Sequence, residues 1–226
     1  MCDYEDFQPR QSERVRENIE WSIAYSYNAL DRENPRILLI GDSICHQYHD
    51  QVRLLLADCA NISYWASSKC VTDPDYFREL SFHLDAYPYQ MICFNNGAHS
   101  LTTRPEAWQE AYEAVVSFLQ ARLPGAKLSL TLCTALNDPA RNEKLCRLNS
   151  IAAQIGQARG LPLIDLYTPT QAMDKDSAML DVFHYKDPAK TVQAEIVVRH
   201  ICRELDLIAG SLRQNSTLTG PDGQIQ

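Results

Sequence analysis

Short apolar runs alternate with longer segments of helical spacing along most of the chain. The apolar runs have the length of strands and lie between polar or turn-forming residues; they cover residues 36–41, 61–66, 90–95, 126–133 and 162–167. The segments of helical spacing cover residues 44–58, 73–86, 104–123, 141–159 and 187–206. Continuously apolar strands separated by helices are typical of a parallel sheet covered on both faces. The pattern therefore predicts an α/β protein, a three-layer α/β/α sandwich around a five-stranded parallel sheet.

The segment before the first predicted strand has a different pattern. Apolar residues recur at steps of four within residues 10–30, at Val15, Ile19, Ile23 and Tyr27. This spacing predicts a helix, and Pro35 ends it because proline disfavours helical geometry at the residue before it. We therefore expect a helical lead over residues 1–35, packed on a domain of residues 36–208. The polar segment 209–226 is predicted to be a disordered tail.

Composition and net charge argue against some classes of binding partner. The chain has 226 residues and a formal net charge of −8, and no cluster of Lys and Arg is longer than two residues. Nucleic acids and anionic membranes bind concentrated positive charge, so neither is an expected partner. No stretch approaches the roughly 18 apolar residues that span a bilayer, and the N-terminus lacks the apolar core of a signal peptide. The sequence therefore predicts a soluble, cytoplasmic protein.

Ser43 stands where the first predicted strand ends and the next helix begins, in the run Gly41, Asp42, Ser43. Backbone N–H groups and the helix dipole at that position favour negative charge on a nearby oxygen. Serine is a weak nucleophile unless a base activates it. Alone, the tripeptide fits an ordinary turn better than a catalytic site, with Gly41 in the bend and Asp42 or Ser43 capping the helix.

Two further elements supply what an activated serine needs. The run "AMLDVFHYKDPAK" places Asp181 three residues before His184, so the carboxylate can orient the imidazole as a base. The run "MICFNNGAHS" ends a predicted strand in Asn95, Asn96 and Gly97, where an amide N–H can point at a developing oxyanion. Both elements lie at the carboxyl ends of predicted strands, which is where ligands bind in open α/β sheets.

In their order along residues 36–206, these elements resemble the SGNH (GDSL-type) serine hydrolases. The resemblance implies a flavodoxin-like sandwich with Ser43 as nucleophile, His184 as base and Asp181 as its orienting carboxylate. It also implies an oxyanion hole made by the Ser43 N–H, a backbone N–H after the second strand, and an Asn side chain after the third. Asn95 is the first candidate for that side chain and Asn96 the second.

The sequence departs from the family pattern in two blocks. The second strand is followed by "YWASSKCVTD" without a glycine, so Ala66, Ser67 or Ser68 must donate the backbone N–H, with Ser67 at the centre. The third block reads Asn-x-Gly-x-His in place of Gly-x-Asn-Asp, as in a subgroup of these hydrolases. A substrate pocket is expected to include residues of these blocks, namely Asp42, Ser68, Gly97 and His99. For His99, a packed loop histidine is an equally good interpretation.

Three other readings are weaker. An α/β-hydrolase requires Gly-x-Ser-x-Gly, but Gly41-x-Ser43 continues to Cys45. A cysteine nucleophile at Cys45 or Cys70 lacks a local His–carboxylate partner, and the eight cysteines, without a C-x-x-C pair, suit a reduced core. His46, His49 and Asp50 share a helix and could face a metal, but a half-buried helix face is the better interpretation.

Together the elements predict a serine esterase that cleaves a carboxylic ester through a Ser-His-Asp triad and an acyl-enzyme. Mostly short polar loops favour a small acyl group on a polar alcohol, so an O-acetylated carbohydrate is the first substrate class. The alternatives are a short- to medium-chain ester, including a thioester or lysophospholipid, and a silent carbohydrate-binding module of the same fold. The mechanism needs no metal and no cofactor, and the expected partner is a small-molecule ester.

Overall fold

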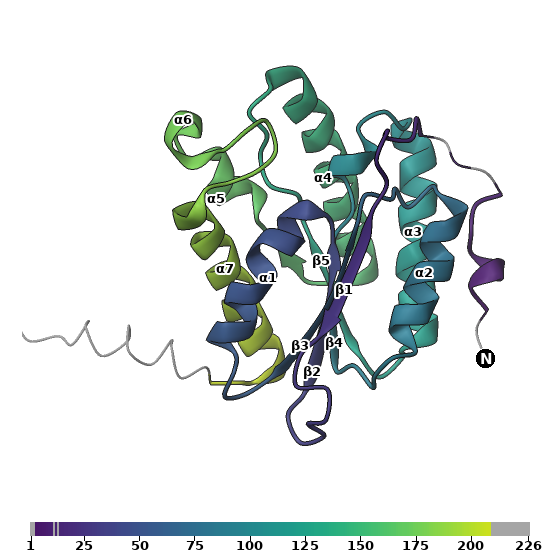
Figure 1. Cartoon of the computed structure of the whole chain (residues 1–226). Helices are drawn as coiled ribbons and strands as arrows, with labels where there is room; N and C mark the ends of the chain where they lie inside the picture. Colours follow the sequence, from purple (N-terminus) through teal and green to yellow (C-terminus); the bar gives the residue numbers. More distant parts are fainter. Residues whose placement is uncertain (1–2, 11, 13, 209–226) are drawn as a thin grey trace, which may run out of the picture.

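A mostly parallel sheet lies between two layers of helices (Figure 1). The computed structural model describes residues 3–10, 12 and 14–208. In this part of the chain the sheet has six strands in the order β1-β3-β2-β4-β5-β6. Their bounds are β1 Ser22–Ser26, β2 Arg36–Gly41, β3 Asn61–Ser67, β4 Met91–Phe94, β5 Lys127–Thr131 and β6 Leu163–Ile164. Strands β2 to β6 are parallel, which confirms the predicted three-layer sandwich, and β1 adds an antiparallel edge strand on β3.

The helices divide between the two faces of the sheet (Figure 1). One face carries α1 Ser43–Leu55, α5 Tyr167–Gln171, α6 Lys175–Ala178 and α7 Asp187–Leu205. The other carries α2 Pro74–Leu84, α3 Pro105–Arg122 and α4 Pro139–Arg159. Two short 3₁₀ turns, η1 Tyr4–Asp6 and η2 Ala98–Ser100, complete the elements. No helix among the described residues has both the length and the apolar character needed to cross a bilayer.

The central strands are buried on both sides because each face has its own core. In β2, Ile37 and Leu39 pack with α1 and α7, whereas Leu38 and Ile40 pack with α2, α3 and α4. Side chains alternate between the two faces of a strand, so a strand between two helical layers needs apolar residues at every position. This is the physical reason that the apolar runs identified the strands.

The predicted helix over residues 10–30 is wrong. Ser22–Ser26 is β1, and no helix forms in the described part of residues 12–21. A step of four fits a strand as well as a helix, since residues i and i+4 share one face of a strand. Moreover, Val15 and Ile19 are 75% and 72% exposed, so the first half of the pattern covers no core.

The chain before β1 is nevertheless fixed to the domain by a buried polar network. Arg14 donates to Asp73 and to Glu20, each at 2.8 Å, and the side chains of Arg14 and Asp73 are fully buried. The Ser68 hydroxyl donates to Glu20 at 2.9 Å and accepts from the Trp21 backbone N–H at 2.9 Å. Burial of such charges is tolerated only when they are paired, so this network determines the path of residues 14–21. The predicted tail, 209–226, lies outside the described residues.

Candidate active site

Ser43 lies at the carboxyl edge of the sheet, at the first position of α1. Asp42 caps this helix, accepting the Ile44 N–H at 2.9 Å, and no described group accepts from the N–H of Ser43 itself. A Cβ on Gly41 would lie 2.5 Å from the Cβ of Cys45. Glycine is therefore required for the chain to turn from β2 directly into α1, and the turn presents Ser43 with a free N–H beside it.

A continuous hydrogen-bond relay joins the three residues predicted as a triad. His184 Nε2 lies 2.9 Å from Ser43 Oγ, and His184 Nδ1 lies 2.8 Å from Asp181 Oδ2. Asp181 Oδ1 also accepts the backbone N–H groups of Phe183 and His184, at 2.7 and 2.9 Å. Desolvation acts to raise the pKa of Asp181, but the hydrogen bonds from His184 and Phe183 outweigh it and lower the pKa. The carboxylate therefore stays ionised and orients the imidazole.

The loop that carries Asp181 and His184 is closed on itself and tied to the sheet. Leu180 N–H donates to His184 O at 2.8 Å, beside an antiparallel bridge between Met179 and Tyr185. The buried Tyr185 hydroxyl donates to the carbonyl of Ala135, in the segment after β5. These bonds hold the imidazole at the end of the sheet where α1 begins.

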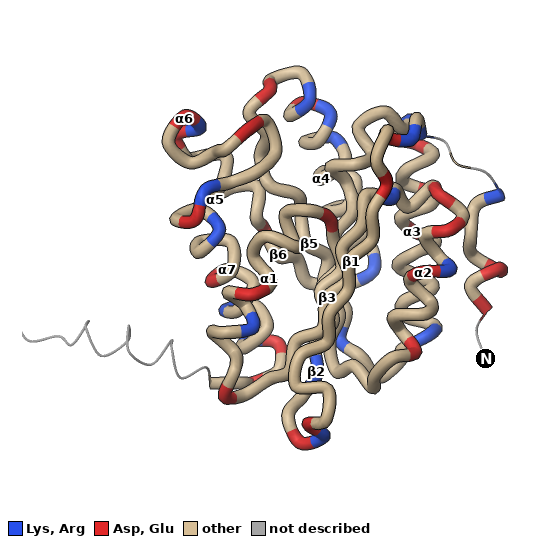
Figure 2. Tube along the Cα trace, in the orientation of Figure 1, with Lys and Arg blue, Asp and Glu red and all other residues tan. Residues whose placement is uncertain are grey.

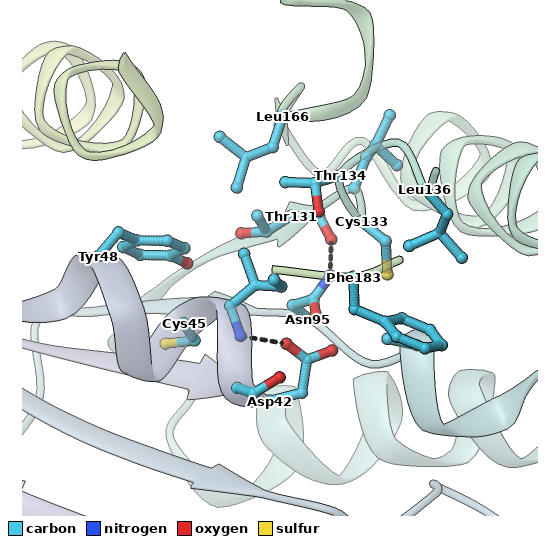
Figure 3. Close-up of a pocket in the computed structure, with 14 residues that line it drawn as sticks. Asp42, Cys45, Tyr48, Asn95, Thr131, Cys133, Thr134, Leu136, Leu166 and Phe183 are labelled. Atoms are coloured by element: carbon cyan, nitrogen blue, oxygen red, sulfur yellow. Dashed lines mark hydrogen bonds between the residues drawn. The ribbon is translucent and has the colours of Figure 1, made fainter. Parts of the chain in front are cut away.

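Ser43 is one of the residues that line a small cavity at the start of α1; Figure 3 shows this cavity. Its volume is about 20 Å³, and Cys45, Tyr48, Asn95 and Thr131 are among the residues that line it. The Thr131 side chain is buried, and its Oγ1 has no hydrogen-bond partner. A cavity that accepts one water-sized group and exposes an unpartnered hydroxyl can hold a water molecule or a small ligand group.

Ser43 also lines a second, larger cleft of about 510 Å³. Its lining combines Ser43 and His184 with His99, Arg141 and residues of the N-terminal segment, among them Trp21. The N-terminal segment thus forms one wall of the cleft. Sequence reasoning missed this wall because its residues come before the first parallel strand, and the spacing of Val15 and Ile19 was taken for the buried face of a helix, whereas both side chains are exposed.

The two candidate asparagines lie in different surroundings. Asn95 lines the small cavity with Ser43, and its amide donates to the Thr131 carbonyl at 2.7 Å and to Cys133 Sγ at 3.2 Å (Figure 3). Asn96 lines neither cavity beside Ser43. Its Oδ1 accepts the Ser100 hydroxyl at 2.9 Å and its Nδ2 donates to Lys69 O at 2.9 Å. Asn96 is thus engaged in holding two loops together.

The remaining predicted pocket residues divide into lining and supporting positions. Asp42 lines the small cavity and His99 the cleft, where His99 Nδ1 lies 2.6 Å from Glu17 and its buried Nε2 has no partner. Ser68 lines neither, because its side chain ties down the N-terminal segment. Gly97 is a packing residue: a Cβ there would lie 2.5 Å from Cys133 Sγ.

Ser67 is buried at the end of β3 and lines neither cavity. Ser68 N–H donates to Trp21 O on the β1 side, whereas Asn61 N–H donates to Pro35 O on the β2 side. Donor directions alternate along a strand, so the N–H of Ser67 points to β2, where the pairing of Gly41 with Ala66 places it on the carbonyl of Gly41. The predicted role of Ser67 therefore has no free N–H to carry it. The N–H of Ser68 is already used.

Two competing sites receive no support from the geometry. Cys45 is fully buried, and burial raises the pKa of its thiol to about 12, so it stays protonated at neutral pH. His46 Nδ1 lies 3.0 Å from the Tyr64 hydroxyl, and His49 Nε2 lies 3.0 Å from that of Tyr27. Within the described part of the chain, no three His, Cys, Asp or Glu side chains are grouped to hold a metal ion.

Comparison with known proteins identifies the fold. No family model matches the sequence, and a comparison with curated proteins finds no match. Among solved structures, the acetyl xylan esterase AlAXEase is 16% identical with a TM-score of 0.64, over 74% of this chain and 99% of that one. The acetylxylan esterase Axe2 from Geobacillus stearothermophilus is 13% identical with a TM-score of 0.58, over 77% and 95%. The lipase/acylhydrolase from Enterococcus faecalis is 18% identical with a TM-score of 0.58, over 74% and 95%. The chain therefore has the fold of the GDSL/SGNH hydrolases.

Proposed function

We propose that the protein is a serine esterase that removes an acetyl group from a polar alcohol, with an O-acetylated carbohydrate as the substrate class. The observation that carries this proposal is the relay from Asp181 through His184 to Ser43, with distances of 2.8 and 2.9 Å. A serine whose hydroxyl contacts an imidazole, itself held by a carboxylate, is the arrangement that activates serine for acyl transfer.

The reaction follows from the positions of these groups. His184 Nε2 takes the proton of Ser43 Oγ as this oxygen attacks the ester carbonyl, and Asp181 stabilises the imidazolium. His184 then gives the proton to the leaving alcohol oxygen, which leaves an acetylated Ser43. Water attacks this acyl-enzyme with His184 again as base, and acetate and the free serine are released.

The negative oxygen of each tetrahedral intermediate needs hydrogen-bond donors. We assign the first donor to the N–H of Ser43, which has no acceptor among the described groups. We assign the second to Asn95, which turns one amide hydrogen from the weak acceptor Cys133 Sγ to the oxyanion. The N–H of Ser67 is not assigned as a donor, because the register of β2 and β3 pairs it with the carbonyl of Gly41. Asn96 is not assigned this role because it lines neither cavity beside Ser43.

The size of the small cavity beside Ser43 supports acetyl as the acyl group. A cavity of about 20 Å³ has room for a methyl group but not for an extended acyl chain. Two of the solved structures with this fold are acetylxylan esterases, which agrees with this choice. The alternative of a medium-chain acyl hydrolase requires this cavity to widen, and no second observation favours it.

Hydrolysis of 4-nitrophenyl acetate by the wild type and by Ser43→Ala tests the proposal. We expect turnover by the wild type, loss of turnover in the variant, and labelling of Ser43 by a fluorophosphonate probe. If wild type and Ser43→Ala hydrolyse the ester equally slowly and neither is labelled, the chain is a silent binding module and the esterase assignment is wrong.

A further inference from the structure

Helix α4 carries three basic side chains on its first turns, and the first of them lines the cleft. They are Arg141, Lys144 and Arg147, which we call the α4 basic strip, and all three are exposed. Arg141 lines the same cleft as Ser43 and His184, and its guanidinium lies over the ring of Phe183, 5.4 Å from the ring centroid. Figure 2 shows basic segments recurring along the first turns of α4. The strip therefore begins within reach of a ligand held at Ser43.

Beyond Arg141 the cleft continues into a second hollow of about 220 Å³. Lys144 and Arg147 line one side of it and the turn from Ser100 to Pro105 lines the other. The hollow and the cleft share Leu101 and Thr102 as lining residues, so the two are neighbours. Residues three apart on a helix are about 4.5 Å apart along its axis, and the strip is therefore long enough to contact more than one negative group.

In the described part of the chain, the three cations of the strip are not held in ion pairs, although Glu143 lies between Arg141 and Lys144 in the sequence of the same helix. Among the described residues, no carboxylate forms an ion pair with Arg141, Lys144 or Arg147, and no acidic side chain lines the second hollow. The cleft itself contains one carboxylate, Glu17, which lies 2.6 Å from His99 Nδ1 on the N-terminal wall. In a chain of net charge −8, a run of unpaired cations beside a cleft attracts anions locally.

The size of the small cavity determines which part of a substrate can contact the α4 basic strip. If the acetyl group occupies the small cavity beside Ser43, the alcohol part must extend into the open cleft, because the cavity holds no more than a methyl-sized group. We propose that the α4 basic strip binds negative charge on the alcohol part, and that the substrate is an acetyl ester of a carboxylated saccharide, such as an O-acetylated uronic acid oligosaccharide. This inference rests on the proposed esterase function and adds the charge of its substrate.

Carboxylate is the favoured anion because Arg presents a planar pair of N–H donors that matches its two oxygens. Arg141 contacts the first carboxylate, next to the acetylated residue, and Lys144 and Arg147 contact those further along the chain. Arg141 is a specificity-determining residue that does not touch the reacting carbonyl, so its effect belongs in KM rather than kcat.

Two aryl acetates that differ in charge test the role of Arg141. The probes are 4-acetoxybenzoate and its methyl ester, and the measured quantity is the ratio of their kcat/KM values in each variant, so that intrinsic reactivity cancels. In Arg141→Gln we expect the ratio of charged to neutral ester to fall about 10-fold, mostly through KM. Arg141→Lys should restore part of it. Arg199→Gln, an equal change of net charge on α7, should leave the ratio as in the wild type.

Oligomeric substrates test the rest of the strip. The probes are an O-acetylated oligogalacturonate and the same oligomer with its carboxylates methyl-esterified. Lys144→Gln and Arg147→Gln should lower the preference for the charged oligomer while affecting the monomeric benzoate less. The charged oligomer should also lose kcat/KM as ionic strength rises, whereas the neutral one should not.

The outcomes separate the two proposals. If both aryl acetates are hydrolysed and Arg141→Gln leaves their ratio unchanged, the strip does not bind substrate and this inference is wrong, while the esterase assignment stands. If 4-acetoxybenzenesulfonate is preferred over the benzoate in an Arg141-dependent way, the anion is not a carboxylate. If no acetyl ester is hydrolysed, the proposed function fails and the inference fails with it.

Discussion

His184 Nε2 and Ser43 Oγ lie 2.9 Å apart although 141 positions separate them in the chain. One residue begins the first helix of the parallel unit, and the other lies in the loop before its last helix. The contact exists because both segments end at the same edge of the sheet. The relay therefore depends on the docking of α7 and α1 against each other on one face.

Removing members of the relay should abolish ester hydrolysis without unfolding the protein. We expect Ser43→Ala or His184→Gln to lower kcat by roughly 10⁴- to 10⁶-fold. Asp181→Asn should cost less, roughly 10²- to 10⁴-fold, because its oxygen still accepts the loop N–H groups of Phe183 and His184. Kinetics with 4-nitrophenyl acetate and circular dichroism measure the two properties. Near-wild-type kcat in either of the first two variants would contradict the assignment.

Thr131 is one of the residues that line the small cavity proposed for the acyl group. Thr131→Ala adds space and, because its Oγ1 has no partner, sacrifices no hydrogen bond. We expect this variant to raise kcat/KM for a propionyl ester relative to the acetyl ester. Thr131→Val keeps the volume and removes only the hydroxyl, so it is the matched control and should keep the acetyl preference. Equal chain-length profiles in all three proteins would mean that the acyl group lies elsewhere.

Gly97 and Cys133 should be energetically coupled. A Cβ at Gly97 would approach Cys133 Sγ to 2.5 Å, so Gly97→Ala should destabilise the fold by about 1–3 kcal/mol through overpacking. Removing the sulfur in Gly97→Ala/Cys133→Ala should recover much of that loss, since the other contacts of the new Cβ are ordinary. Urea unfolding of the two single variants and the double variant gives the coupling energy. Strict additivity would show that the clash is relieved in another way.

Among the ion pairs that hold the N-terminal wall, the buried pair between Arg14 and Asp73 should contribute most to the free energy of unfolding. Arg14→Met leaves the fully buried Asp73 carboxylate without its cationic partner, at a cost of about 3–5 kcal/mol. The matched control is Arg16→Met, because the Arg16–Asp75 pair is exposed and worth about 1 kcal/mol or less. Denaturant unfolding measures both. We also expect Arg14→Met to raise KM, since the displaced segment forms the cleft wall.

Lowering the pH should destabilise the N-terminal wall, because Glu20 becomes protonated. Desolvation acts to raise the pKa of Glu20, but hydrogen bonds from Arg14, Ser68 and the Glu17 N–H outweigh it and lower the pKa. A folded-state pKa below the unfolded value gives stability that is present above about pH 4.3 and is lost as the pH falls through the folded value. The difference in unfolding free energy between wild type and Glu20→Gln should therefore be largest near neutrality and shrink below about pH 4. A constant difference across this range would contradict the linkage.

The parallel sheet was predictable because burial on both faces leaves an unmistakable run of apolar residues, as in β2. The relay was predictable because its residues fall at strand ends, and parallel strands bring those ends together. Strand β1 was not, because a strand and a helix both bring residues four apart onto one face. The choice between Asn95 and Asn96 depends on which way adjacent side chains point after a strand ends, and local sequence does not encode this direction.

The basic strip beside the cleft could not be predicted from the sequence, for a different reason. Arg141, Lys144 and Arg147 are ordinary residues of an exposed helix, and the composition as a whole is acidic. They matter because Leu101 lines both the cleft and the second hollow, so Lys144 and Arg147 lie next to the cleft that contains Ser43. That proximity is a tertiary relationship between α4 and the segment after β4, so no local motif could have revealed it.

The segment that forms the N-terminal wall of the cleft, residues 14–21, can be exchanged as one unit. Val15, Glu17 and Trp21 line the cleft, yet they precede every strand of the parallel unit and the residues of the relay. An exchange of residues 14–21 at the gene level, keeping Arg14 and Glu20 as anchors, alters the ligand-facing surface without interrupting the chain that carries Ser43 and His184. Libraries aimed at new ester substrates can therefore vary this segment while the codons of the relay residues stay unchanged.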